Sequence, residues 1–198
     1  SGYASLETLF TLAPWIFLFL VPAVTMRMMA EEKKSGTMEL LMTRPISDLQ
    51  IVISKYLAAL VLVLIALIPT LIYFYSLYQL GNPVGNVDVA GTVGSYIGLF
   101  FLAAIYVSIG IFASSLTSNQ IIAFIIAVLI SFFFYMGFDF LSGMWIFGGI
   151  DTFIVDLGIN AHYKSMSRGV IDTRDIVYFL SVIVVFIFLT KTIIQQRK

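Results

Sequence analysis

Charged residues that could bind a partner are concentrated in one stretch of the chain, residues 27–55, which lies between two long apolar runs. A polar connector this short between two bilayer-length runs must lie against a membrane surface. Within it, residues 36–42 can form a two-turn helix, because Glu39 falls in the first turn, where a carboxylate suits the helix dipole, and Pro45 prevents continuation. A short amphipathic helix on a membrane face is a docking element.

The start of the next helix is also marked in the sequence. Ser47 as N-cap and Gln50 three residues later form a capping box, and Ile46 with Ile51 supplies the hydrophobic staple. This pattern predicts that the chain turns back into the membrane at a defined angle. The alternative interpretation is that residues 27–55 form a solvated, positively charged loop that only sets the topology.

Residue types that do catalysis or bind metals are scarce in this chain. Cysteine is absent, and the single histidine, His162, has only scattered aspartates around it, whereas a metal site needs two or three further ligands at suitable spacing. No Gly-x-x-x-x-Gly-Lys-Ser/Thr sequence is present, so the chain has no P-loop for ATP. We therefore expect no enzyme activity, no metal and no cofactor. The net charge of zero gives no reason to expect a nucleic-acid partner.

The composition is that of a membrane protein. Hydrophobic residues make up 60% of the chain and charged residues 11%, and the mean hydropathy is +1.02. About five runs reach the ~20 residues that cross a bilayer. They cover residues 8–26, 56–78, 92–115, 119–138 and 176–194. The predicted fold class is an all-α, polytopic helical membrane protein with about five spans.

Lysine and arginine predict the orientation of these spans. The stretch 27–55 is basic and so is the tail after the last span, whereas the connector 79–91 contains no Lys or Arg. By the positive-inside rule, the first connector and the C-terminus are cytoplasmic. An odd number of spans then places Ser1 outside, and we expect one further span before it in the complete protein.

Several smaller patterns concern how the spans turn and pack. Pro14, Pro22 and Pro69 each remove a helical hydrogen bond and favour a kink. Gly94 and Gly98 have GxxxG spacing, which predicts close packing against another helix or a second subunit. Further patterns predict a turn at 82–86, a capping box of Thr117 with Gln120, and an N-cap at Asp172.

The longest connector, residues 139–174, mixes aromatic residues, aspartates and glycines. This mixture predicts short helices that lie in the outer membrane interface or re-enter it, rather than two more spanning helices. Aspartates at 151 and 156 interrupt the apolar run, which argues against a spanning pair.

The stretch EEKKSGTMELLMTRPIS, followed by IVISKYL, resembles the first cytoplasmic loop of ABC-2 type transporter permeases. The resemblance covers nearly the whole chain and implies a six-span permease, with residues 1–198 as one transmembrane domain, 27–50 as the coupling loop and 139–174 as an extracytoplasmic segment. In this family the short helix of the loop fits into a groove on a separate ATPase subunit, which binds the ATP. The implied coupling residues are Glu31, Lys33, Lys34, Gly36, Thr37, Glu39, Leu40, Leu41, Met42 and Arg44.

A narrower resemblance, to the gliding-motility-associated permease of GldF type, rests on three segments. They are LAPW at 12–15, YQLGNPVGN at 78–86 and SMSRGVIDTRD at 165–175. This resemblance implies a bacterial cytoplasmic (inner) membrane protein with a link to gliding motility or surface secretion. Its implied partners are the ABC ATPase, membrane lipid and a second permease. The second permease is either identical, giving a homodimer, or homologous, giving a heterodimer.

Two other classes of function stay open. The interiors of the predicted spans contain essentially no ionisable side chain, whereas proton- or sodium-coupled carriers usually keep one as the coupling site. An ATP-independent carrier or channel is therefore disfavoured. A membrane anchor that recruits a cytoplasmic partner through residues 27–55 without transporting anything is the second alternative.

Overall fold

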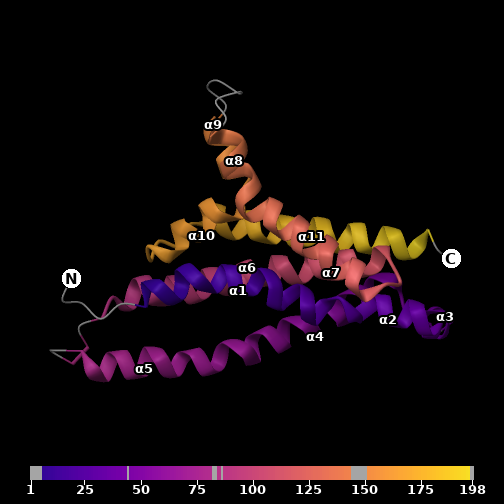
Figure 1. Ribbon diagram of the computed structural model, residues 1–198, viewed down its shortest axis with the longest axis horizontal. Helices are drawn as coiled ribbons and strands as arrows, with labels where there is room; N and C mark the ends of the chain where they lie inside the picture. Colours follow the sequence, from indigo (N-terminus) through magenta and orange to yellow (C-terminus); the bar gives the residue numbers. More distant parts are fainter. Residues whose placement is uncertain (1–5, 44, 82–83, 86, 144–150, 197–198) are drawn as a thin grey trace.

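The computed structural model describes residues 6–43, 45–81, 84–85, 87–143 and 151–196, and within these ranges the chain is helical and contains no strand (Figure 1). The helices follow one another in this order: α1 Glu7–Thr25, α2 Arg27–Ser35, α3 Thr37–Met42, α4 Asp48–Leu67, the 3₁₀ turn η1 Ile68–Thr70, α5 Leu71–Leu80, α6 Val89–Leu116, α7 Gln120–Phe132, the π-helical segment η2 Phe133–Gly137, α8 Phe138–Gly143, α9 Asp151–Asp156, α10 Ile159–Ser167 and α11 Thr173–Gln195.

Five helical stretches in the described part of the chain are long and apolar enough to cross a membrane, which confirms the predicted fold class. They are Glu7–Ser35, Asp48–Leu80, Val89–Leu116, Gln120–Gly143 and Thr173–Gln195. Each contains one of the five predicted spans almost completely, but the helices extend beyond the apolar runs. The second begins eight residues before the predicted 56, because the capping box at Ser47 starts the helix before the hydrophobic sequence does.

Helix α6 lies at the centre of the bundle and packs against α1, α4, α7, α10 and α11. It buries 78% of its most apolar 18 residues, compared with 17–44% in the other four stretches. Small residues recur along α6 and let neighbouring helices approach closely. At Gly110, for example, a Cβ atom would lie 2.0 Å from Thr25 Oγ1 of α1, so glycine is required for this contact.

The bundle has two distinct ends (Figure 1). The first carries the corner between α2 and α3 together with the last turns of α11, and we call it the α3 end. The other carries the end of α5, the start of α6, and α10, and we call it the α10 end. The basic residues Arg27, Lys33, Lys34 and Lys55 all belong to helices at or near the α3 end.

The helix caps agree with the sequence in two of three cases. At Ser47 both halves of the capping box form, with Gln50 N donating to Ser47 Oγ and Ser47 N donating to Gln50 Oε1. Asp172 caps α11 by accepting from Arg174 N. The capping box predicted for Thr117 is wrong. Asn119 is the N-cap of α7, because it directly precedes the first helical residue, Gln120. Its Oδ1 accepts from Ile121 N at 2.9 Å.

The prolines have different effects on their helices. Pro69 lies in the 3₁₀ turn η1, which joins α4 to α5 and so interrupts the second span as predicted. Pro14 and Pro22 lie inside α1, which runs through both of them to Thr25. The turn predicted at 82–86 falls mostly outside the described residues.

Between the fourth and fifth spans the described chain forms short helices, as the composition of residues 139–174 suggested. The fourth span continues through η2 into α8, which projects away from the bundle together with α9 (Figure 1). Helix α10 returns to the bundle and packs against α6 and α11. It therefore covers the α10 end of the central helix.

Candidate functional site

The polar stretch after the first span is mostly helical. Helix α2 follows α1 after the single residue Met26, so the two form one bent helix from Glu7 to Ser35. The sequence predicted a polar connector here, with a helix only at 36–42, and the structure adds that residues 27–35 are also helical and that α2 packs against α6 and α7. Met29 and Ala30 of α2 are completely buried.

A serine of α6 bonds the junction between α1 and α2. The backbone N–H groups of Met29 and Ala30 donate to Ser114 Oγ at 3.0 Å each. In a continuous helix these groups would donate to carbonyls of the preceding turn. Ser114 Oγ in turn donates to the Met26 carbonyl at 2.9 Å. A side chain inserted into the helical hydrogen-bond ladder bends the helix. Ser114 thereby fixes the direction of α2 relative to α6.

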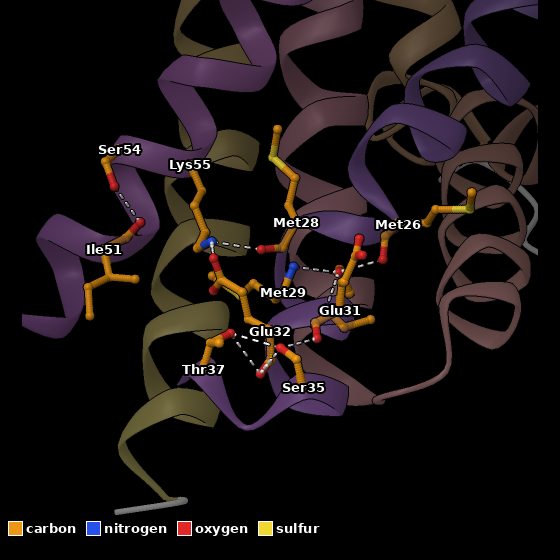
Figure 2. Close-up of polar contacts among 12 residues, drawn as sticks. Met26, Met28, Met29, Glu31, Glu32, Ser35, Thr37, Ile51, Ser54 and Lys55 are labelled. Carbon is orange, nitrogen blue, oxygen red and sulfur yellow. Dashed lines mark hydrogen bonds and ion pairs between the residues drawn. The ribbon is translucent and has the colours of Figure 1, made fainter. Parts of the chain in front are cut away.

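Two lysines attach α2 to its other neighbours, and Figure 2 shows the contacts of one of them, Lys55. Lys55 of α4 forms an ion pair with Glu32, with its Nζ atom 2.5 Å from Oε1, and it also donates to the Met28 carbonyl at 2.7 Å. Lys33 donates to the carbonyl of Ser115 at the end of α6. Helix α2 is therefore bonded to α4 and α6 and continuous with α1.

The corner between α2 and α3 depends on a glycine. Gly36 has φ +72°, in the left-handed region that side chains other than glycine rarely adopt, and it ends α2 as its C-cap. Around it, Ser35 Oγ donates to the Glu31 carbonyl at 2.9 Å and lies 2.9 Å from Thr37 Oγ1 (Figure 2). The predicted helix at 36–42 is present as α3, Thr37–Met42, one residue shorter because Gly36 forms the corner.

Helix α3 has one buried anchor and one exposed apolar side chain. Met38 is 5% exposed and belongs to the core cluster, whereas Leu40 is 68% exposed. Glu39 beside it is exposed, and Leu41 is half-buried. Leu40 is therefore open to contact with another protein at the α3 end of the bundle.

The other residues of the predicted coupling set are distributed as follows. Glu31, Lys34, Gly36 and Thr37 are exposed and Lys33 is half-buried against Ser115; Arg44 and the Met42 side chain lie outside what the structure describes. The exposed members thus surround the α2–α3 corner. Sequence reasoning missed the residues that hold this corner in place, Ser114, Glu32 and Lys55, since the sequence gave no sign that they meet.

Gly94 and Gly98 lie at the opposite end and face α10 of the same chain. A Cβ atom at Gly94 would lie 2.3 Å from the Met166 carbonyl oxygen, and one at Gly98 would lie 3.1 Å from Met166 Cβ. The small-residue spacing therefore serves the close approach of α10 to α6. The structure contains one chain, so it does not bear on a contact with a second subunit.

His162 holds α10, α11 and the end of α9 together. Its Nδ1 lies 2.6 Å from Asp175 Oδ1, its Nε2 lies 2.8 Å from the Asp156 carbonyl oxygen, and its ring stacks on Tyr178 with centroids 4.0 Å apart. Within the described residues no group of three or more potential metal ligands lies together. The contacts of His162 join α10 to α11 and to the end of α9, and the sequence did not show its pairing with Asp175.

Tyr163, the next residue, connects α10 to α1. Its hydroxyl donates to the Phe10 carbonyl at 2.7 Å. Burial raises the pKa of the Tyr163 phenol, and the nearby Tyr135 adds to the effect, so the hydroxyl stays protonated and remains a donor at physiological pH.

Five spans, a polar helical corner with an exposed leucine, and the absence of a P-loop can now be compared with known proteins. A family model described as ABC-2 family transporter protein matches residues 8–197, which is nearly the whole chain. The chain belongs to the ABC-2 transporter family. This ABC-2 protein is therefore a multi-pass membrane component of a transporter, and ABC-2 permeases in general work with an ABC ATPase subunit. No curated protein matches this ABC-2 chain.

Proposed function

We propose that this ABC-2 protein is the permease subunit of an ATP-driven exporter and that a separate ATPase docks on the α2–α3 corner. The observation that carries this proposal is the position of Leu40. It is 68% exposed on a helix whose neighbour α2 is bonded to two spans and continuous with a third. A force applied at this corner would reach α1, α4 and α6 directly.

The proposed mechanism is mechanical. ATP binding closes the partner ATPase dimer, and α3 moves with the groove in which it lies. Because Glu32 pairs with Lys55 and Ser114 bonds both Met26 and Met29, the displacement passes to α4 and α6 as well as to α1. The moving unit therefore includes α6 in addition to α1 and α4, the helices of the two spans that flank the corner. Leu40 and Leu41 supply the apolar docking contacts, and Glu31, Lys34 and Glu39 the polar ones.

The finer features of the proposal rest on the sequence. Residues 1–198 form one transmembrane domain, and the basic residues at the α3 end favour a cytoplasmic position for this end and for the C-terminus. The chain resembles GldF-type permeases in three segments, which supports a bacterial inner membrane location and a role in gliding motility or surface secretion. A second permease, identical or homologous, completes the transmembrane unit. The chain itself has no catalytic site and needs no cofactor, since the partner binds ATP.

The test is co-expression of the complete protein with the ABC ATPase encoded beside it, followed by purification in detergent. We expect the ATPase to remain bound to the permease through affinity and size-exclusion chromatography. An ATPase that never co-purifies, together with substrate flux in vesicles without nucleotide, would contradict the proposal and favour the ATP-independent carrier. Binding of the ATPase without any substrate-dependent change in ATP hydrolysis would favour the non-transporting anchor.

A further inference from the structure

A cavity of about 860 Å³ opens at the α10 end, far from the α2–α3 corner. It lies between the first turns of α1 and α6, the π-helical segment η2, and α10. Three observations already described shape it. Gly94 and Gly98 let α10 approach α6, Tyr163 bonds α10 to α1, and the π-helical turns of η2 present Tyr135 and Met136 to the cavity. Segments of π-helix occur frequently at functional sites.

Charged side chains of both signs line this cavity. Lys164 lies in the last turn of α10 and Arg168 is the C-cap of that helix, whereas Glu7 is the first residue of α1 and Asp88 is the N-cap of α6. All four are exposed, and in the described part of the chain none of them is in an ion pair within 4.0 Å. Asp88 Oδ1 accepts from Gly91 N at 2.9 Å as the N-cap of α6. The cavity therefore presents two cations and two carboxylates that do not neutralise each other directly.

The remaining walls combine aromatic, aliphatic and small polar side chains, and several of the polar ones bond within the protein. Trp15 packs edge-on against Tyr135, with ring centroids 5.7 Å apart, and Asn160 donates to Asp139 Oδ2 at 2.5 Å. Ser95 Oγ donates to the Ser167 carbonyl at 3.3 Å. The four charged side chains are the ionic groups that the cavity offers to a ligand.

An exposed apolar face of α1 begins beside the cavity. Leu12, Ile16 and Phe19 are 53%, 57% and 54% exposed and recur at the three- and four-residue spacing of one helix face. They follow the cavity residues Thr11 and Trp15 toward the middle of the membrane span. Tryptophan and tyrosine are typical of the level of lipid headgroups, so the cavity lies where a headgroup would be and the exposed apolar face of α1 where acyl chains would be.

We propose that this cavity binds the headgroup of a zwitterionic phospholipid that carries a phosphodiester and a primary ammonium, with the acyl chains along α1. Lys164 and Arg168 bind the phosphate, as lysine and arginine do in other phosphate sites. Glu7 and Asp88 accept hydrogen bonds from the ammonium. The site is separate from the α2–α3 corner, and its occupancy does not depend on the proposed ATPase.

The test measures lipid retention by the complete, delipidated protein in detergent, without nucleotide, with phosphatidylethanolamine, phosphatidylcholine and phosphatidylglycerol as probes. We expect phosphatidylethanolamine to bind at least tenfold more tightly than the other two. Phosphatidylcholine lacks ammonium N–H donors and phosphatidylglycerol lacks the cation, so each loses the contacts with Glu7 and Asp88. Glycerophosphoethanolamine, the headgroup without chains, should compete only weakly. Competition as strong as that of the lipid would overturn the assignment to a lipid.

Two sets of variants make the charge assignment specific. Lys164→Ala with Arg168→Ala should lower the affinity for phosphatidylethanolamine at least tenfold. Glu7→Gln with Asp88→Asn, in which Asn keeps the N-cap of α6, should retain binding but shift the preference toward phosphatidylglycerol. Arg174→Ala is the matched control, since Arg174 is exposed near α10 and does not line the cavity. Equal retention of the three lipids by the wild-type protein would overturn the proposal. An unchanged lipid preference in both double variants, each eluting as folded protein, would also overturn it.

Discussion

Replacing Leu40 by aspartate is expected to abolish ATPase binding while leaving the permease folded. The side chain is 68% exposed, so its removal deletes little of the permease core, but a carboxylate in an apolar docking groove would be desolvated without a partner. Central interface residues contribute about 2 kcal/mol or more, which corresponds to roughly thirtyfold in affinity. The measurement is the amount of ATPase retained by the variant in detergent, together with the ATP hydrolysis rate of the purified complex.

Val170→Asp is the control for Leu40→Asp. Val170 is 62% exposed, similar to Leu40, but it lies after α10 at the opposite end of the bundle. It should retain the ATPase at the wild-type level. Leu41 is less suitable for this test, because it is half-buried and its replacement would also disturb the permease. If both aspartate variants keep the ATPase, the docking surface is elsewhere.

Gly94→Ala is expected to destabilise the packing of α10 on α6. The new Cβ atom would lie 2.3 Å from the Met166 carbonyl oxygen and 2.9 Å from Gly169 Cα, and both are backbone atoms that move only if α10 moves. Overpacking of this kind costs about 1–3 kcal/mol. We expect a clear decrease in the midpoint of thermal unfolding in detergent. The measurement is the fraction of folded protein that remains after heating, monitored by size-exclusion chromatography.

Gly143→Ala provides the comparison for Gly94→Ala. A Cβ atom at Gly143 would meet no atom within 4 Å, so this change should leave the midpoint unchanged or raise it slightly. Equal midpoints for the two alanine variants would show that α10 does not pack on α6 as described.

The features that the sequence predicted are those determined by local chemistry. Apolar run length predicted the five spans, and the hydroxyl and amide of Ser47 and Gln50 predicted where α4 begins. The helix predicted at 36–42 begins one residue later, because Gly36 adopts the left-handed conformation between α2 and α3. The error at Thr117 is of the same local kind, since Asn119 competes for the same helix start and forms the better-placed bond.

The features that the sequence did not predict depend on contacts between distant segments. Ser114 lies 85 residues from Met29, and Tyr163 lies 153 residues from Phe10, so no local pattern relates them. The continuation of α1 into α2 belongs to this group. Residues 27–35 are too polar for a span, and they are helical and partly buried because α6 supplies bonds to their backbone. The charged lining of the α10-end cavity was hidden for the same reason.

The measurement that tests the central claim most directly is cross-linking from a single cysteine at position 40. Residues 1–198 contain no cysteine, so Leu40→Cys adds one defined attachment point within them. A short thiol-reactive cross-linker should join this permease variant to its co-expressed ATPase, and Val170→Cys should give no such product. Cross-linking of the ATPase from position 170 but not from position 40 would contradict docking at the α2–α3 corner and, with it, the proposed route from ATP hydrolysis to the membrane spans.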